Sequence, residues 1–171
     1  MTNTSATKKK TPKSKKPVKK MKISTEREKA LSAFQHGRRL QEVNALGYGR
    51  CFTCGKIIHI SEGDGGHGIP RNHKATELEP TNCHLQCRVC NRFNYGEQHL
   101  FMKHVASLYG EEEVQRLYDL DSASKGSEEA LSRLSEEDRN LALMPRTATY
   151  YHEQFLKWNK VCKDLEHKER G

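Results

Sequence analysis

Two pairs of cysteines carry the clearest chemistry in this sequence of 171 residues. Cys51 and Cys54 form one C-x-x-C knuckle, and Cys87 and Cys90 form a second one. Each knuckle presents two soft thiolates on a tight turn, so the two together supply the four ligands of a closed tetrahedral Zn²⁺ site. Because such a site has no open coordination position, we expect this zinc to be structural and not catalytic.

The cysteine count has a second interpretation. Six cysteines in a chain without a secretory signal favour metal binding, and a disulfide framework is the alternative. Two cysteines are left over from the knuckles. Cys83 could compete with Cys87 for the metal, whereas Cys162 lies in a Lys/Glu-rich helical pattern and is expected to be a small apolar residue against a neighbour.

The 32 residues between the knuckles hold side chains suited to phosphodiester hydrolysis, which needs a general base, a cation and a group that orients the base. His67 follows a glycine-rich turn, and an imidazole suits proton abstraction near neutral pH. Asn82 could hold one histidine tautomer through a hydrogen bond. Asp64, together with Asn91 just after the second knuckle, supplies oxygens of the hard type that Mg²⁺ prefers.

In their order and spacing these residues resemble the HNH, or ββα-metal, nucleases, in the version stapled by two C-x-x-C knuckles. Within that class the sequence is most similar to the phage NinG/Rap recombination nucleases, over roughly residues 47–110 with a similar basic region before them. The segments that carry the resemblance are Asp64-Gly-Gly-His67, Arg71, Asn82-Cys-His84-Leu-Gln86-Cys87-Arg-x-Cys90-Asn91 and Tyr95-Gly96.

The resemblance implies an α+β fold with a small zinc-stapled ββα-metal core. It also implies a metal-dependent endonuclease that cuts branched DNA, including Holliday junctions and D-loops. His67 would be the general base, Asn82 its orienting partner, and Asn91 a ligand of a catalytic Mg²⁺ or Mn²⁺. The alternatives are a non-catalytic zinc-ribbon DNA-binding adaptor and a nonselective HNH nicking enzyme.

One position departs from the family pattern. Many HNH sites place an acidic metal ligand immediately before the base, whereas this chain has Gly66 there and its nearest acid is Asp64. Asp64 could bind the cation through a different turn geometry, or His84 could serve instead. Each has a structural alternative, because Asp is common in turns and a histidine near a zinc ligand could support the zinc site from its outer shell.

Basic residues predict DNA as the partner. Nine lysines lie between Lys8 and Lys22, and removing them from the formal charge of +8 leaves about −1. We expect residues 1–22 to be a disordered tail that neutralises phosphates without reading sequence. Its candidate DNA contacts are Lys8, Lys9, Lys10, Lys13, Lys15, Lys16, Lys19 and Lys20. Nearer the site the candidates are Arg71, His73, Lys74, Arg88 and Arg92. Since no element resembles a base reader, recognition by DNA shape is expected.

The hydrophobic pattern divides the chain into segments. After the tail we predict a helix at 23–46, the nuclease core at 47–110 and a helical region at 111–171. The core is expected to contain strands at 56–60 and 67–69, a turn at 62–66, a loop at 71–81, and a helix from 88 bent at Gly96. Further helices are predicted at 111–120, after Ser127 and, beyond Pro145, at 149–169.

Resolving a four-way junction requires two symmetric nicks, so we expect a homodimer. The aromatic face around Tyr151, Phe155 and Trp158 could form the dimer surface or could pack within one chain. Without an apolar signal region or membrane-length segment, the protein is expected in the cytoplasm, that of the host bacterium if a phage encodes it.

Overall fold

The structure is a computed structural model, and it describes residues 21–168. Of the tail predicted to be disordered, residues 1–20 lie outside the described part, and so do all eight of the tail lysines named as candidate DNA contacts. The last three residues, 169–171, lie outside it as well. The described residues form a mixed α+β fold, which confirms the predicted fold class.

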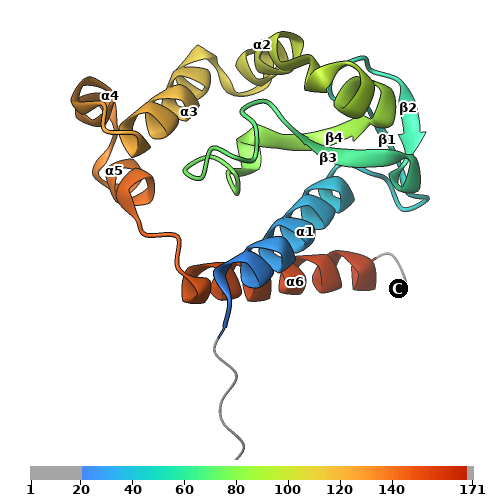
Figure 1. The fold of residues 1–171 in the computed structure, drawn as a ribbon. Helices are drawn as coiled ribbons and strands as arrows, with labels where there is room; N and C mark the ends of the chain where they lie inside the picture. The colour runs from blue at the N-terminus through green and yellow to red at the C-terminus, as the bar shows by residue number, and fades with distance from the viewer. Residues whose placement is uncertain (1–20, 169–171) are drawn as a thin grey trace, which may run out of the picture.

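Two long helices from opposite ends of the chain pack against each other. They are α1 (Ile23–Gln41) and α6 (Ala148–Lys168), and α1 lies between α6 and a pair of strands (Figure 1). Phe34 meets Trp158 edge to face, with ring centroids 4.8 Å apart. Tyr151 and Trp158 are buried in this contact, so the aromatic face of the last helix packs within one chain. The helix predicted at 23–46 begins at the expected residue but ends at Gln41, before its predicted end.

The strands form two separate antiparallel hairpins. One pairs β1 (Tyr48–Arg50) with β2 (Ile57–His59), and the other pairs β3 (Gly63–His67) with β4 (Cys83–Cys87). In the second hairpin His67 lies opposite Cys83, and Gly63 lies opposite Cys87. The candidate base therefore lies at one end of this hairpin and a candidate zinc ligand lies at the other.

The predicted turn at 62–66 is wrong, because β3 occupies 63–66. The strand expected at 67–69 shares only His67 with β3, and β4 was not predicted at all. Glycines are frequent in turns, but those of β3 allow close packing of a strand. A Cβ added to Gly65 would lie 2.8 Å from Cβ of Gln35 on α1, and one on Gly66 would collide with the side chain of Gln86. The strand pattern was hidden because these positions lack side chains.

The second half of the described chain is helical. A π-helical turn (Val89–Phe93) and a tight turn (Tyr95–Glu97) lead into α2 (Gln98–Tyr109), and Gly96 has a φ of 82°, which confirms the predicted bend. Then follow α3 (Glu111–Ser124), α4 (Glu128–Arg133) and α5 (Glu136–Leu143), and α3 extends beyond its predicted end. The hydroxyl of Ser127 accepts from the amide of Ala130, so the predicted helix cap is confirmed. Within residues 21–168, no helix combines the length and apolarity needed to cross a membrane.

Candidate functional site

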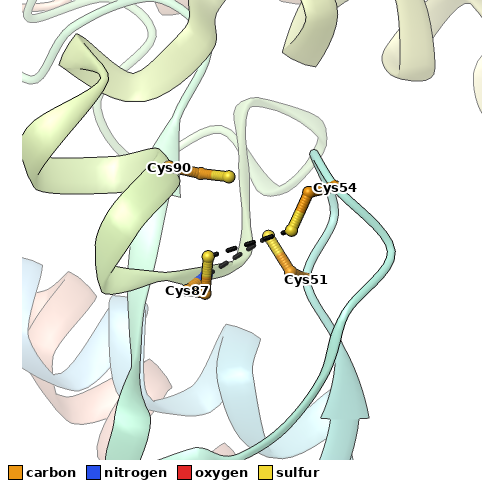
Figure 2. A group of neighbouring side chains, drawn as sticks. All are labelled: Cys51, Cys54, Cys87 and Cys90. Carbon is orange, nitrogen blue, oxygen red and sulfur yellow. Dashed lines mark hydrogen bonds between the residues drawn. The ribbon is translucent and has the colours of Figure 1, made fainter.

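The four knuckle cysteines converge on one point (Figure 2). Their Sγ atoms all lie within 4.8 Å of one another, and those of Cys54 and Cys87 are 3.9 Å apart. Tetrahedral zinc with Zn–S bonds of about 2.3 Å places its sulfurs about 3.8 Å apart. The cluster could therefore hold a structural metal such as zinc.

The local electrostatics suit a cation in this cluster. Burial alone would raise the pKa of the Cys51 thiol, but the backbone N–H groups around it, including that of Cys87, outweigh burial and lower the pKa. Burial and the neighbouring thiols of Cys87 and Cys54 raise the pKa of Cys90. Four thiolates at this spacing repel one another, and a bound cation removes that repulsion.

The remaining cysteines lie elsewhere, and none of the six is in a disulfide. Cys83 is fully buried on β4 in the core beneath α1, so it does not compete for the metal. Cys162 is buried on α6 and faces the backbone oxygen of Ala33 at 3.5 Å. The disulfide alternative is therefore wrong, and the packing role expected of Cys162 is confirmed.

His67 ends strand β3 and is only 8% exposed. Its Nε2 lies 3.0 Å from the backbone oxygen of Glu77. A carbonyl oxygen can only accept, so the neutral ring carries its proton on Nε2 and keeps Nδ1 as the basic nitrogen. Burial lowers the pKa of His67 to about 4, against the opposing effect of the Glu77 carbonyl, so the ring is neutral at pH 7 and able to accept a proton.

The Asn82 side chain bonds to the backbone and not to His67. Its Oδ1 accepts from the Ile69 amide at 2.7 Å, and its Nδ2 donates to the backbone oxygens of Ile69 and Thr76 at 2.9 and 3.0 Å. The prediction that Asn82 holds the histidine tautomer is thus corrected, because the Glu77 carbonyl makes that bond. Asn82 instead closes the loop between β3 and β4, which brings Glu77 to the ring.

Glu77 is fully buried and is held from two helices. Arg27 on α1 donates to Oε2 from Nε at 2.8 Å and from Nη2 at 2.5 Å. The Tyr151 hydroxyl on α6 donates to Oε1 at 2.5 Å. No sequence signal pointed to this role, because Glu77 lies in a loop without a period and its partners are 50 and 74 residues away along the chain.

A cleft of about 960 Å³ lies beside His67, between α1, the edge of β3 and the segment after the second knuckle. Asp64 and Asn91 line it together with His67. The Asn91 amide donates to Asp64 at 3.0 Å, and Arg92 donates to both Asp64 oxygens at 2.7 Å. These bonds, that of Arg92 first, lower the pKa of the Asp64 carboxyl. Three of the predicted catalytic and metal-binding residues therefore share one cleft.

His84 does not line this cleft. Its ring is buried, stacks on Phe52 with centroids 3.8 Å apart, and has its Nδ1 2.6 Å from Glu42 Oε1. The suggestion that His84 replaces Asp64 as a ligand of the catalytic cation is corrected by this placement. The Phe52 ring and the Glu42 carboxylate already contact the imidazole, so it packs in the protein and does not reach the cleft.

The predicted DNA contacts divide into two groups. Arg71, Lys74 and Arg92 line the cleft, as does Arg27, which was not predicted. His73 is instead paired with Asp121 of α3 at 2.8 Å, and Arg88 donates to the backbone oxygen of Ser61 at 2.8 Å. His73 and Arg88 therefore make structural contacts and do not line the cleft.

Comparison with known proteins identifies the family of this chain. A family model described as Bacteriophage Lambda NinG protein matches residues 2–144, which include both cysteine knuckles and every residue that lines the cleft. No curated protein and no solved structure matches the chain. The matched region ends before α6, so Tyr151 lies outside it. Since the match covers far more than half of the sequence, the chain belongs to the bacteriophage lambda NinG family.

Proposed function

We propose that this chain is a metal-dependent DNA endonuclease that cuts branched recombination intermediates such as Holliday junctions and D-loops. Membership of the NinG family indicates a phage protein connected with recombination. The observation that carries the proposal is the cleft, because it gathers His67, Asp64 and Asn91 among basic side chains. A base, hard oxygen ligands and positive charge are what phosphodiester hydrolysis requires.

His67 acts as the general base in this proposal. Its unprotonated Nδ1 takes a proton from a water molecule, whose oxygen attacks phosphorus while the bond to the leaving sugar oxygen breaks. The Glu77 carbonyl keeps the other ring nitrogen protonated, so the tautomer does not change. A phosphate in the cleft raises the pKa of the ring from about 4 toward neutrality, because a nearby negative charge favours the imidazolium.

Asp64 and Asn91 are the residues that would hold the catalytic Mg²⁺ or Mn²⁺. A carboxylate and an amide oxygen are ligands of the hard type, and Mg²⁺ commonly binds one or two carboxylates together with substrate phosphates. The cation would supply stabilisation of the charge that develops on the phosphate. Arg92 neutralises Asp64 in the structure, so a cation on Asp64 would leave this guanidinium to a DNA phosphate.

Substrate binding rests on phosphate contacts. Arg71, Lys74 and Arg92 are candidates in the cleft, and the lysine tail would add affinity that falls steeply with salt. These contacts do not read bases, so selection of branched DNA would come from its shape. Cutting a four-way junction symmetrically calls for a homodimer, whose interface must lie away from the buried face of α6.

The test is cleavage of a labelled four-way junction beside its matched linear duplex, with Mg²⁺ or Mn²⁺. We expect paired cuts in the junction alone. His67→Ala should abolish them while the protein keeps one zinc per chain by metal analysis. His167→Ala is the matched control, because His167 is exposed on α6 and its loss should leave cleavage unchanged.

Other outcomes identify the alternatives. Binding of the junction without any cutting, by a zinc-loaded wild-type chain, would indicate a DNA-binding adaptor. Equal cutting of junction and duplex would indicate a nonselective nicking enzyme. Full activity of His67→Ala would show that the cleft does not perform the chemistry through this ring.

A further inference from the structure

Two exposed aromatic rings stand in the segment between the second knuckle and α2. Phe93 is 74% exposed and Tyr95 is 90% exposed. Tyr95 also lines the cleft that contains His67 and Asp64. Single exposed apolar residues are common on proteins and need no explanation. Here two exposed rings lie only two positions apart, and one of them is on the wall of a polar cleft. This arrangement calls for a specific explanation.

The backbone holds Tyr95 in this position at an energetic cost. Tyr95 and Glu97 have φ values of 52° and 48°, and Gly96 between them has 82°. Left-handed conformations are rare for residues other than glycine, so they persist only where surrounding contacts impose them. Here the buried Gln86 side chain donates to the Gly96 oxygen at 2.9 Å. The turn is thus anchored in the core, and the Tyr95 ring is left outside it.

Charge beside the rings indicates what they meet. Arg92 lies next to Phe93 in the sequence, and its side chain is 58% exposed although it pairs with Asp64. It lines the same cleft as Tyr95, together with Arg71 and Lys74. Proteins that bind unpaired nucleic acid combine such cations, which follow the phosphate backbone, with aromatic rings on which bases stack. Duplex DNA hides the faces of its bases, whereas unpaired bases at a branch expose them.

We propose that Tyr95 and Phe93 form a stacking platform for unpaired bases at a branch point, with the cations that line the same cleft on the adjoining phosphates. The inference rests on the proposed function, and it names the feature of D-loops and forks that the cleft recognises, since the bases of a four-way junction are all paired. Because stacking tolerates any base, the platform selects unpaired structure without selecting sequence.

The probe is a forked DNA with 2-aminopurine at its first unpaired position, since the emission of this base falls when its face is covered. Zinc-loaded full-length protein without Mg²⁺ or Mn²⁺ should quench the probe and should bind the fork more tightly than a duplex at the same salt concentration. Tyr95→Asn removes the ring and keeps a residue that tolerates a positive φ. We expect it to weaken fork binding roughly tenfold, to lose the quenching, and to change duplex binding less than twofold.

Three variants complete the test. Tyr95→Phe keeps the ring and should retain both quenching and affinity, whereas Phe93→Ala should weaken fork binding in the same direction as Tyr95→Asn. Tyr118→Ala is the matched control, because this ring is 46% exposed on α3 and does not line the cleft. Unchanged quenching in Tyr95→Asn, or equal weakening of fork and duplex binding, would overturn the platform.

The platform and the nuclease can fail separately. If the wild-type chain shows Tyr95-dependent quenching but cuts no DNA when Mg²⁺ or Mn²⁺ is added, the platform stands and the proposed activity is wrong. If Tyr95→Asn cuts the junction and binds the fork as the wild-type chain does, the activity stands and the platform is wrong.

Discussion

The β3–β4 hairpin is fixed at its two ends by different chemistry. At the Gly63–Cys87 end, four thiols converge at the spacing of a metal site. At the His67–Cys83 end, a hydrogen bond from His67 to Glu77 and the ion pair of Glu77 with Arg27 hold the hairpin in place. The first end is built from two knuckles that are each short-range motifs, whereas the second collects groups from α1, the loop and α6.

The two ends also differ in what they leave available. A four-thiolate zinc site is closed, so it can stabilise the fold but offers no position to a substrate. The other end keeps a neutral imidazole beside a cleft of about 960 Å³, with one ring nitrogen already committed to the Glu77 carbonyl. In the proposed function, the metal end therefore provides stability and the hydrogen-bonded end provides the chemistry.

Removing the metal should change the stability difference between the two ends of the hairpin more than any other treatment. Structural zinc in small modules contributes on the order of 10 to 16 kcal/mol of apparent binding free energy, much of it realised as folding. A chelator should therefore unfold the zinc end, measured as loss of amide exchange protection in β1, β2 and the Cys87 half of β4. Cys51→Ser should act in the same way, because an alcohol is a poor replacement for a thiolate.

The control is the packing of α1 on α6, which contains no metal ligand. Its amides should remain better protected than those of the zinc end after chelation. Unchanged protection at both ends, with the metal shown to be gone, would contradict the division of roles.

Acid should act on the other end. The folded pKa of His67 is lowered to about 4 from an ordinary 6.5. Between these two pH values the unfolded chain binds a proton on His67 and the folded chain does not. The contribution of neutral His67 to the free energy of unfolding is fully present above pH 6.5 and is lost as the pH falls toward 4. The full loss is about 3 kcal/mol, of which about 1 kcal/mol should be lost by pH 5.5.

Urea unfolding at pH 7.5 and pH 5.5 measures this loss, with His67→Gln as the comparison. Gln can still donate to the Glu77 carbonyl but does not titrate, so the variant should lose about 1 kcal/mol less than the wild-type chain. Both proteins contain the same cysteine cluster, and its acid sensitivity cancels in the difference. Equal losses would show that His67 titrates normally in the fold.

The same comparison shows what could be read from the sequence. The spacing of the knuckles predicted the thiol cluster, and Gly96, Ser127 and Pro145 marked real breaks, because each of these signals acts within a few residues. The sequence also predicted that His67, Asp64 and Asn91 belong to one site, and they line one cleft.

The features that the sequence did not predict depend on contacts between residues far apart along the chain. The glycines of β3 predicted a turn because a missing side chain looks the same whether it frees the backbone or lets a helix approach. Asn82 was assigned to His67 by its type, yet its three bonds are to backbone groups that only the folded loop brings near. Glu77 could not be found, since its partners come from both long helices.

A single hydrogen bond tests whether α6, outside the region matched by the family, supports the His67 end. Tyr151→Phe removes one hydrogen bond to the buried Glu77 carboxylate and should cost about 1 to 2 kcal/mol of unfolding free energy. It should also change the pKa of His67 measured by NMR, because Glu77 carries the carbonyl that holds the ring. Tyr150→Phe is the matched control, since the Tyr150 ring lies against Arg146 and not Glu77. A loss of stability in Tyr151→Phe without any shift of the His67 pKa would reduce α6 to a packing element, and the positioning of His67 would then depend on Arg27 and the loop.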